Sequence, residues 1–272
     1  MGKSIITGSL VTYNNRLSDI DNVLLSIENS TVKIVLIILD NSSNDKLQAH
    51  LQNKNCVYIK AESNLGFGRG HNVCFERANQ LNSEYHFIIN PDVYFDDYIV
   101  KSIVDKFINQ DDIAVIMPKI VYPDNKTQYL CKLIPSPADL ILRRFFPFGK
   151  KKHDYKYELN FVPDNIEFEP PMVSGCFLGV KTNFLIKIKG FDDRFFMYLE
   201  DVDIIRRLSK HGKIIYYPSV IVTHKYEKSS YKNLKLLSYH MISAIKYFNK
   251  WGWFFDSERR KVNNSIKKEF QL

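Results

Sequence analysis

Apolar and polar residues alternate in blocks along the first 118 residues. Short apolar runs are separated by stretches in which apolar residues recur every three or four positions. This alternation is typical of strands joined by helices around a mostly parallel sheet. We predict strands at 5–12, 33–39, 56–60, 86–89 and 114–117, and helices at 17–28, 68–81 and 97–109. The chain is therefore predicted to begin as an α/β, Rossmann-like domain.

The pattern becomes irregular between residues 121 and 171, where prolines are frequent. Long irregular insertions in compact domains are usually functional or mobile. Regular patterns then return. We predict a strand at 172–181, a helix at 201–211 and short strands at 214–217 and 220–223.

The C-terminal segment is basic and aromatic. Residues 225–272 contain 11 Lys and Arg against 4 Asp and Glu, and so hold nearly all of the net charge of +8. One helical stripe is predicted here, formed by Leu234, Leu237, Met241, Ile245 and Phe248. Two interpretations stay open. The helix either packs on the domain or seeks a lipid interface, as the aromatic residues at 251–255 favour.

Composition excludes several classes of protein. The 272 residues are 45% hydrophobic and 25% charged, which excludes disorder, and no apolar run is long enough to span a bilayer. The 4 cysteines are scattered, which predicts neither a zinc site nor a redox dithiol. The N-terminus lacks a secretory signal, so we expect a cytoplasmic protein. No nucleic-acid-binding motif accompanies the basic charge, so we expect no nucleic-acid partner.

Polar residues follow the predicted strands, where open α/β sheets bind ligands. Asp92 comes directly after a strand, and a carboxylate there suits a divalent cation such as Mg²⁺ or Mn²⁺. Asp40 also ends a strand and could accept a hydrogen bond from a nucleotide base. Each aspartate alone could instead be structural, Asp40 through an Asx turn.

Two further segments could carry chemistry. Residues 64–72 are glycine-rich and open a helix, which suits a phosphate or nucleoside, but they match neither a P-loop nor a dinucleotide-binding fingerprint. Glu200, Asp201 and Asp203 place three carboxylates beside aromatic residues. Repulsion and apolar surroundings raise a carboxylate's pKa, which suits a general base. Asp203 could instead pair with Arg207, four residues on. We expect one base and one structural acid.

Taken in order, these segments resemble the family 2 glycosyltransferases with the GT-A fold. The resemblance covers roughly residues 5–250 and is strongest to the bacterial rhamnosyltransferase-like branch that builds O-antigens and other surface polysaccharides. The matching stretches are 11–14, 39–43, 64–72, 90–93, 174–177, 190–203 and His224. Residues 247–250, Tyr-Phe-Asn-Lys, are similar to the Tyr-Phe-x-Lys sequence near the end of this branch.

The resemblance implies a domain organisation and roles for individual residues. Residues 1–225 would form the catalytic domain, with a nucleotide-sugar half at about 1–118 and an acceptor half at about 119–225. A helical tail would follow at 226–272.

Asp201 would be the catalytic base, and Asp92 and His224 would hold the metal. The nucleotide sugar would contact Thr12, Tyr13, Asn14, Asp40, Asn64, Gly66, Asn72, Asn90 and Asp92. The residues supporting the acceptor side would be Ser174, Gly175, Glu200 and Asp203. Asn90 stands where the family's Asp-x-Asp motif has its first aspartate.

The function implied by the resemblance is inverting, metal-dependent sugar transfer. We expect L-rhamnose to move from dTDP-β-L-rhamnose to a polyprenyl-diphosphate-linked saccharide at the inner face of the cytoplasmic membrane, with the protein peripherally bound there. UDP-galactofuranose, UDP-GlcNAc and UDP-galactose are alternative donors. Alternatives of another class are an inactive GT-A scaffold and a basic protein that binds nucleic acid or membrane.

Overall fold

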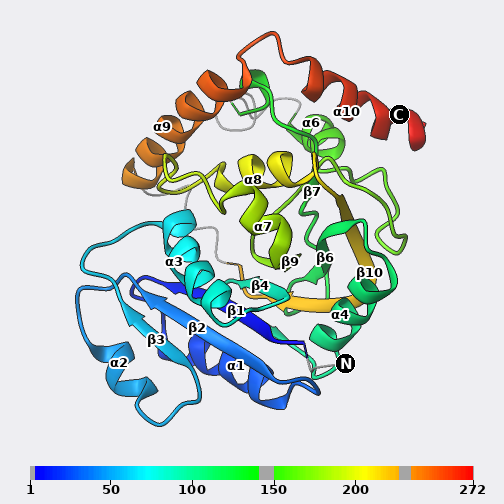
Figure 1. The fold of residues 1–272 in the computed structure, drawn as a ribbon. Helices are drawn as coiled ribbons and strands as arrows, with labels where there is room; N and C mark the ends of the chain where they lie inside the picture. Colours follow the sequence, from blue (N-terminus) through cyan, green and yellow to red (C-terminus); the bar gives the residue numbers. More distant parts are fainter. Residues whose placement is uncertain (1–3, 141–149, 227–233, 272) are drawn as a thin grey trace.

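The fold is built on one 8-stranded mixed sheet in the order β3-β2-β1-β4-β9-β6-β10-β5 (Figure 1). A computed structural model describes residues 4–140, 150–226 and 234–271. The strands of this sheet are β1 (Ile6–Thr12), β2 (Ile34–Asp40), β3 (Val57–Lys60), β4 (Tyr85–Ile89), β5 (Val93–Phe95), β6 (Ile113–Val121), β9 (Phe177–Lys181) and β10 (Lys213–His224). A small second sheet pairs β7 (Cys131–Lys132) with β8 (Met172–Val173).

Most strands of the large sheet run in the same direction. The pairs β3-β2, β2-β1, β1-β4 and β6-β10 are parallel. Strand β9 is antiparallel to both of its neighbours, β4 and β6, and the edge strand β5 is antiparallel to β10. The α/β, mostly parallel sheet predicted from the sequence is therefore confirmed, with two reversed strands that the pattern did not predict.

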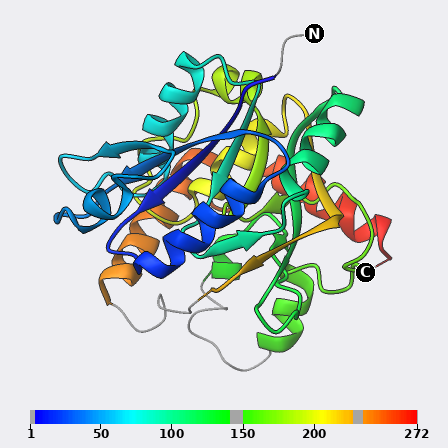
Figure 2. The same ribbon diagram turned by 90° about the horizontal axis from the view of Figure 1, so that it is seen from below.

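Helices cover both faces of the sheet. They are α1 (Leu17–Asn29), α2 (Lys46–Leu51), α3 (Phe67–Gln80), α4 (Ile99–Asn109), α6 (Lys150–Tyr157), α7 (Thr182–Ile188), α8 (Glu200–Leu208), α9 (Leu234–Trp251) and α10 (Ser257–Glu269). Alternate residues of β2 point to opposite faces: Leu36 and Ile38 pack with α1, whereas Ile37 and Leu39 pack with α3. Figure 2 shows the sheet from below, with α1 crossing in front of the strands.

The predicted elements are confirmed with small shifts, except in two places. The strand predicted at 172–181 is two strands, β8 and β9, separated by the Ser-Gly-Cys segment at 174–176. The strands predicted at 214–217 and 220–223 are one strand, β10, whose register against β6 shifts between Tyr217 and Ile221. Helix α2 and strand β5 were not predicted, because both are too short to show a period.

The C-terminal helices pack on the domain. Tyr247 and Phe248 of α9 join Phe195, Leu199 and Val202 in a buried cluster, and in Figure 1 α9 and α10 lie beyond α7 and α8, away from the sheet. The predicted amphipathic helix is confirmed, but its apolar stripe is not the face that packs on the domain. Of that stripe only Phe248 is buried, and the residues buried beside it are Ser243 and Tyr247. In the described ranges, no helix combines the length and apolarity required to cross a bilayer.

Candidate active site

The carboxyl ends of four parallel strands meet at one edge of the sheet. Thr12 ends β1, Asp40 ends β2, Asn90 follows β4 and His224 ends β10. Thr12 and Asp40 are register partners, and the Thr12 hydroxyl donates to Asp40 Oδ1 at 3.3 Å. The strand-end residues identified in the sequence therefore share one edge of the sheet, where α/β folds bind ligands.

Asp40 is a fully buried, hydrogen-bonded carboxylate. Its Oδ1 also accepts the Ser42 backbone N–H at 2.8 Å, and its Oδ2 accepts from the Tyr58 hydroxyl at 2.9 Å and from Lys60 at 3.3 Å. Burial would raise the pKa of Asp40, but the bonds from Ser42 and Tyr58 and the charge of Lys60 outweigh it and lower the pKa. A nucleotide base that hydrogen-bonds to Asp40 must therefore displace Tyr58 or Lys60 from Oδ2.

The residues after β1 lie at the surface. Tyr13 is 52% exposed, and Asn14 has a left-handed backbone with φ of 53°. The Asn14 backbone N–H donates to Ser42 Oγ at 2.8 Å, and its side chain accepts from Asn44 at 3.1 Å. Tyr13 and Asn14 therefore flank the Asp40 end of β2 from the solvent side.

The glycine-rich loop is fastened to the end of β2. Asn41 Oδ1 accepts the Leu65 backbone N–H at 2.9 Å, and Asn64 Oδ1 accepts the Gly66 N–H at 2.9 Å in an Asx turn. Gly66 has a φ of 81° and lies so close to Phe196 that an added Cβ would stand 2.1 Å from the Phe196 carbonyl oxygen. Glycine is therefore required at 66 both by its backbone and by the approach of the 195–199 segment.

Asn72 is engaged by another part of the protein. Its Nδ2 donates to the Phe191 carbonyl and to Asp193 Oδ1, both at 2.9 Å, and its Oδ1 accepts the Phe191 N–H at 2.8 Å. The expected contact with a nucleoside thus competes with these bonds. In the structure, Asn72 joins α3 to the segment that leads to Asp201.

Asp92 and His224 form a pair whose geometry is set by Gln128. His224 Nε2 lies 3.2 Å from Asp92 Oδ1, and His224 Nδ1 lies 3.0 Å from Gln128 Oε1. Gln128 Nε2 donates to the carbonyls of Val121 and His224, so its Oε1 is an acceptor and Nδ1 of His224 carries a proton. The other nitrogen, Nε2, therefore faces Asp92, an orientation typical of a histidine that binds metal.

The donor set at this edge fits a hard divalent cation. Mg²⁺ and Mn²⁺ sites of this kind use one or two protein ligands together with substrate phosphates and water. Asp92 and His224 would be two such ligands, and Asn90 Oδ1 is a buried oxygen without a hydrogen-bond partner in the described residues. Nowhere in those ranges do three or more His, Cys, Asp or Glu side chains gather closely enough to hold a metal alone. Substrate phosphates would therefore have to complete the coordination.

Positive charge surrounds Asp92. Burial lowers the pKa of His224, but Cys176 and Asp92 raise it by more, to about 10. Asp19 is a buried carboxylate whose two oxygens hold Arg16 at 3.0 Å and Lys225 at 3.4 Å. The Lys225 backbone N–H donates to the Asp92 carbonyl at 2.9 Å, and the charge of Arg16 helps lower the pKa of Asp92. This cationic environment suits a diphosphate.

The Glu200–Asp201 pair begins α8, next to the 174–176 segment. The Asp201 carboxylate accepts a hydrogen bond from the backbone N–H of Val202 at 2.8 Å. Gly175 lies close by, since a Cβ added to it would stand 3.4 Å from Asp201 Cβ. One residue further on, the Cys176 carbonyl accepts the Asn90 N–H at 2.8 Å. The 174–176 segment therefore links Asp201 to the Asn90–Asp92 turn, while Ser174 itself donates its backbone N–H to Leu130.

The two adjacent carboxyl groups differ in environment. Glu200 is buried, and its Oε2 has no hydrogen-bond partner within the described ranges. Burial and repulsion from Asp201 raise the pKa of Glu200 to about 8. Burial also raises the pKa of Asp201, against the charge of Lys132 and backbone hydrogen bonds from Val202 and Gly175. Burial without a hydrogen-bond partner therefore favours the protonated form of Glu200, whereas the backbone hydrogen bonds from Val202 and Gly175 favour the carboxylate form of Asp201.

The raised pKa of Glu200 predicts a pH dependence of stability. The folded protein keeps this proton up to about pH 8, whereas an unfolded glutamate releases it near its ordinary pKa of 4.5. The free energy of unfolding should therefore fall by about 1.4 kcal/mol per pH unit in between, through this group alone. Glu200→Gln removes the titration, so its stability relative to wild type should increase from pH 5 to pH 8 in urea unfolding. A gap that stays constant with pH, or one that changes no more than that of the control Glu62→Gln at an exposed position, would contradict this.

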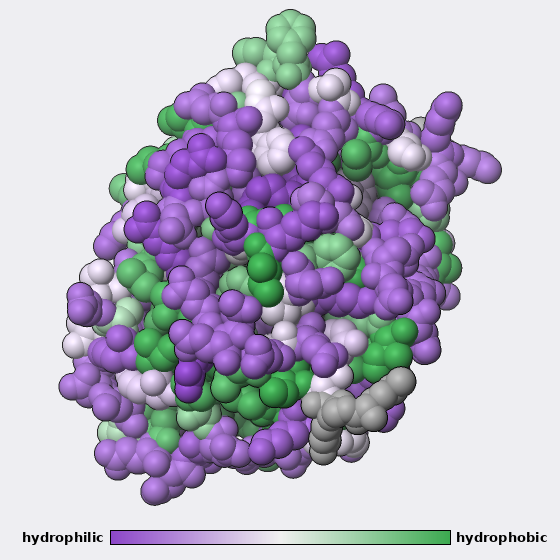
Figure 3. All heavy atoms as spheres, in the orientation of Figure 1, coloured by the Kyte–Doolittle hydropathy of each residue, from purple (hydrophilic) through white to green (hydrophobic). Residues whose placement is uncertain are grey.

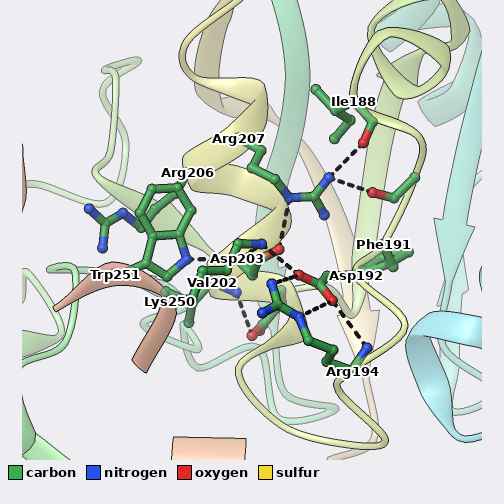
Figure 4. Close-up of polar contacts among 12 residues, drawn as sticks. Ile188, Phe191, Asp192, Arg194, Val202, Asp203, Arg206, Arg207, Lys250 and Trp251 are labelled. Carbon is green, nitrogen blue, oxygen red and sulfur yellow. Dashed lines mark hydrogen bonds and ion pairs between the residues drawn. The ribbon is translucent and has the colours of Figure 1, made fainter. Parts of the chain in front are cut away.

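Asp203 is the structural acid expected beside the base. It is completely buried, and its Oδ2 accepts from Arg207 Nε at 2.8 Å, which confirms the predicted pair (Figure 4). Its Oδ1 accepts from Trp251 Nε1 at 2.8 Å and lies 2.5 Å from Lys250 Nζ. All of these partners are protein groups, so Asp203 fastens α8 to α9.

Sequence reasoning missed Gln128, Asp19 and Asn41. Gln128 lies in the irregular insertion, 96 residues from the histidine that it orients, and no local pattern marks it. Asp19 lies on α1, where an acidic residue in the first turn reads as a favourable helix start. Asn41 follows Asp40 in the 39–43 motif, and this position was the one feature of the sequence that could have marked it as part of the site.

Comparisons with known proteins point to one family. Residues 9–169 match the family model for "Glycosyl transferase family 2". The chain is 27% identical over 223 residues to N-acetylglucosaminyl-diphospho-decaprenol L-rhamnosyltransferase of Mycobacterium tuberculosis, covering 75% of this chain and 71% of the relative. It is 24% identical over 196 residues to rhamnosyltransferase WbbL of Escherichia coli, covering 67% and 69%.

A solved structure agrees in fold. The crystal structure of GalNAc-T7 with UDP, GalNAc and Mn²⁺ superposes with a TM-score of 0.62 at 13% identity, covering 84% of this chain and 45% of that one. The chain thus spans less than half the length of that structure. The family model matches more than half of the chain, so the protein belongs to glycosyl transferase family 2 and has the GT-A fold.

Proposed function

We propose that the protein transfers L-rhamnose from dTDP-β-L-rhamnose to a polyprenyl-diphosphate-linked saccharide, with inversion at the anomeric carbon. The observation that carries the proposal is the link from Asp201 through residues 174–176 to Asn90 and the Asp92–His224 pair. This link supports a base at Asp201 close to a diphosphate site at Asp92. The names of the two relatives support rhamnose as the sugar, and one of them supports a lipid-diphosphate acceptor.

Residues of this chain carry out the proton transfer and stabilise the leaving group. Asp201 accepts the proton of the acceptor hydroxyl. The acceptor oxygen bonds to the anomeric carbon as the bond from that carbon to the diphosphate oxygen breaks on the opposite face, and the configuration inverts. Arg16 and Lys225 stabilise the charge that collects on the departing diphosphate. A divalent cation, when held by Asp92 and His224, would supply further positive charge to the diphosphate.

A donor screen tests the proposal. Wild-type protein is incubated with dTDP-rhamnose, UDP-GlcNAc, UDP-galactose or UDP-galactofuranose, with Mg²⁺, Mn²⁺ or EDTA, and with a GlcNAc-diphosphate-lipid analogue. Mass spectrometry should show rhamnose transfer that EDTA lowers and added Mn²⁺ restores. Transfer from a UDP-sugar alone would replace the donor but keep the reaction class. Binding of nucleotide diphosphates without transfer from any donor would support an inactive GT-A scaffold instead.

We further propose that the protein binds an anionic membrane surface through one face of its C-terminal helices. Leu234, Met241, Ile242 and Ile245 lie exposed on α9 at helical spacing. Trp253 continues this face, because its Nε1 donates to Asn249 on α9 at 2.8 Å. Phe254 and Phe255 follow at 71% and 89% exposure, and Figure 3 shows apolar side chains over the loop between α9 and α10. The tail's positive charge complements anionic lipid.

Substitution of this face should release the protein from membranes without unfolding it. Ile242→Ser with Phe255→Ser removes apolar contact that the fold does not use, so vesicle binding should weaken by ~10-fold or more at about 0.8 kcal/mol per buried CH₂. Sedimentation with vesicles that contain phosphatidylglycerol measures it. The control, Ile108→Ser, changes an exposed isoleucine on α4 at 59% exposure. Equal sedimentation of the double variant and the control would contradict a membrane contact at this face.

A further inference from the structure

The segment that carries Asp201 has a strained backbone. Tyr198 and Leu199 precede the Glu200–Asp201 pair, and both lie in the left-handed region, with φ of 71° and 63°. Neither is a glycine, and two successive side chains in this region are unusual. Such strain persists only where surrounding groups hold it, and it is often found beside active sites.

Helix α9 packs along this segment. Ser243 Oγ donates to the Met197 carbonyl and Lys246 Nζ donates to the Arg194 carbonyl, both at 2.7 Å. The rings of Tyr239 and Phe196 lie 4.6 Å apart between centroids. Helix α9 therefore holds the backbone immediately before the strained residues.

Lys250 joins the two ends of the segment. Its Nζ lies 2.7 Å from Asp192 Oδ2 and 2.5 Å from Asp203 Oδ1, so one ammonium group bridges two carboxylates eleven positions apart (Figure 4). Asp203 is fully buried, and Trp251 supports the same oxygen. The strained residues and Asp201 lie between residues 192 and 203 in the sequence. The bridge therefore fixes the distance between the two ends of the segment that contains them.

We propose that Lys250 is a positioning residue for sugar transfer. It closes the 192–203 segment and thereby sets where Asp201 stands relative to the acceptor hydroxyl, without touching substrate. This proposal rests on the proposed role of Asp201 as the base. It also gives a function to the Tyr-Phe-Asn-Lys motif, since Tyr247 and Phe248 bury the helix end from which Lys250 reaches the two carboxylates.

Loss of the bridge alone leaves no carboxylate without a partner. Asp192 retains Arg194, at 2.9 and 2.6 Å, and Asp203 retains Arg207 at 2.8 Å and Trp251. Lys250→Met should therefore fold. Asp192→Asn is a second variant, which removes the same bridge from its other end together with the ion pair between Asp192 and the exposed Arg194. It keeps the contact between Lys250 and Asp203, so the buried charge of Asp203 stays paired.

The experiment combines kinetics with hydrogen exchange. Lys250→Met and Asp192→Asn should each lower kcat by about 10²-fold with the donor KM unchanged, because a base displaced by about 1 Å has that effect. The double variant should be no slower than the slower single variant, since both remove one bridge. Amides of residues 192–203 should exchange faster in each variant. Lys101→Met, which breaks the surface pair with Asp105 on α4, is the matched control and should match wild type.

The two readouts separate the possible results. An unchanged kcat in both variants, or a lower kcat without faster exchange in 192–203, overturns the positioning role. Additive rate losses in the double variant also overturn it, because the two residues would then act separately. If wild type transfers no sugar from any donor, the proposed function has failed, and exchange alone then decides whether Lys250 holds the segment.

Discussion

Replacing Asp201 with Asn should lower the rate of sugar transfer by ~10²–10⁴-fold. Asparagine keeps the shape of the side chain but cannot accept the acceptor proton. The proposed donor site contains Asp92 and His224 rather than Asp201, so the affinity for nucleotide diphosphate should stay near that of wild type. Initial rates of transfer and nucleotide titrations, both at neutral pH, measure the two quantities.

Glu200→Gln is the matched control for this prediction. Glutamine resembles the protonated glutamate that the raised pKa of Glu200 implies at neutral pH, so this variant should keep a far larger share of the rate than Asp201→Asn. The opposite order, with Glu200→Gln inactive and Asp201→Asn active, would assign the base to Glu200. The pair of variants therefore decides which of two adjacent carboxyl groups takes the proton.

Gly66→Ala should destabilise the fold and abolish most activity. The new Cβ would lie 2.1 Å from the Phe196 carbonyl oxygen, and alanine would have to adopt a φ of 81°. Backbone strain and overpacking each cost about 1–3 kcal/mol, so we expect a loss of several kcal/mol in urea unfolding. Any Gly66→Ala protein that still folds should transfer sugar slowly, because the clash displaces the segment that carries Asp201.

Gly8→Ala provides the comparison. This glycine is also buried, but its backbone has no positive φ and its added Cβ would meet flexible side-chain ends, the nearest being Ile89 Cδ1 at 3.2 Å. Its unfolding free energy should therefore change less than that of Gly66→Ala. Equal losses at the two positions would mean that removal of any buried glycine, rather than contact with Phe196, is responsible.

The sequence was most informative at the ends of strands. Asp40, Asn90, Asp92 and His224 could be placed at one edge of the sheet because parallel strands share a carboxyl edge. The Asp203–Arg207 pair could be predicted because residues four apart on a helix are neighbours. Both arguments depend only on local geometry, which a single sequence expresses well.

Contacts between distant segments could not be predicted in the same way. The spacing of apolar residues on α9 identified a helix but not the face that it buries, because Tyr247 and Ser243 are held by hydrogen bonds that a hydrophobic pattern does not record. Likewise Asn72 lies in a motif that suggested a nucleoside, yet its amide binds residues more than a hundred positions away. Such pairings follow from the assembled fold.

The reversed strand β9 has a consequence for the order in which the newly made chain can fold. It lies between β4 and β6, so the two parts of the sheet stay separate until residues 177–181 have left the ribosome. A truncated chain that ends at residue 118 would contain β4 but not β9, and would expose the hydrogen-bonding edge of a fully buried strand. Open edges of this kind recruit other strands. A chain that ends at residue 118 should therefore aggregate when it is made alone, because later strands are needed to complete its sheet.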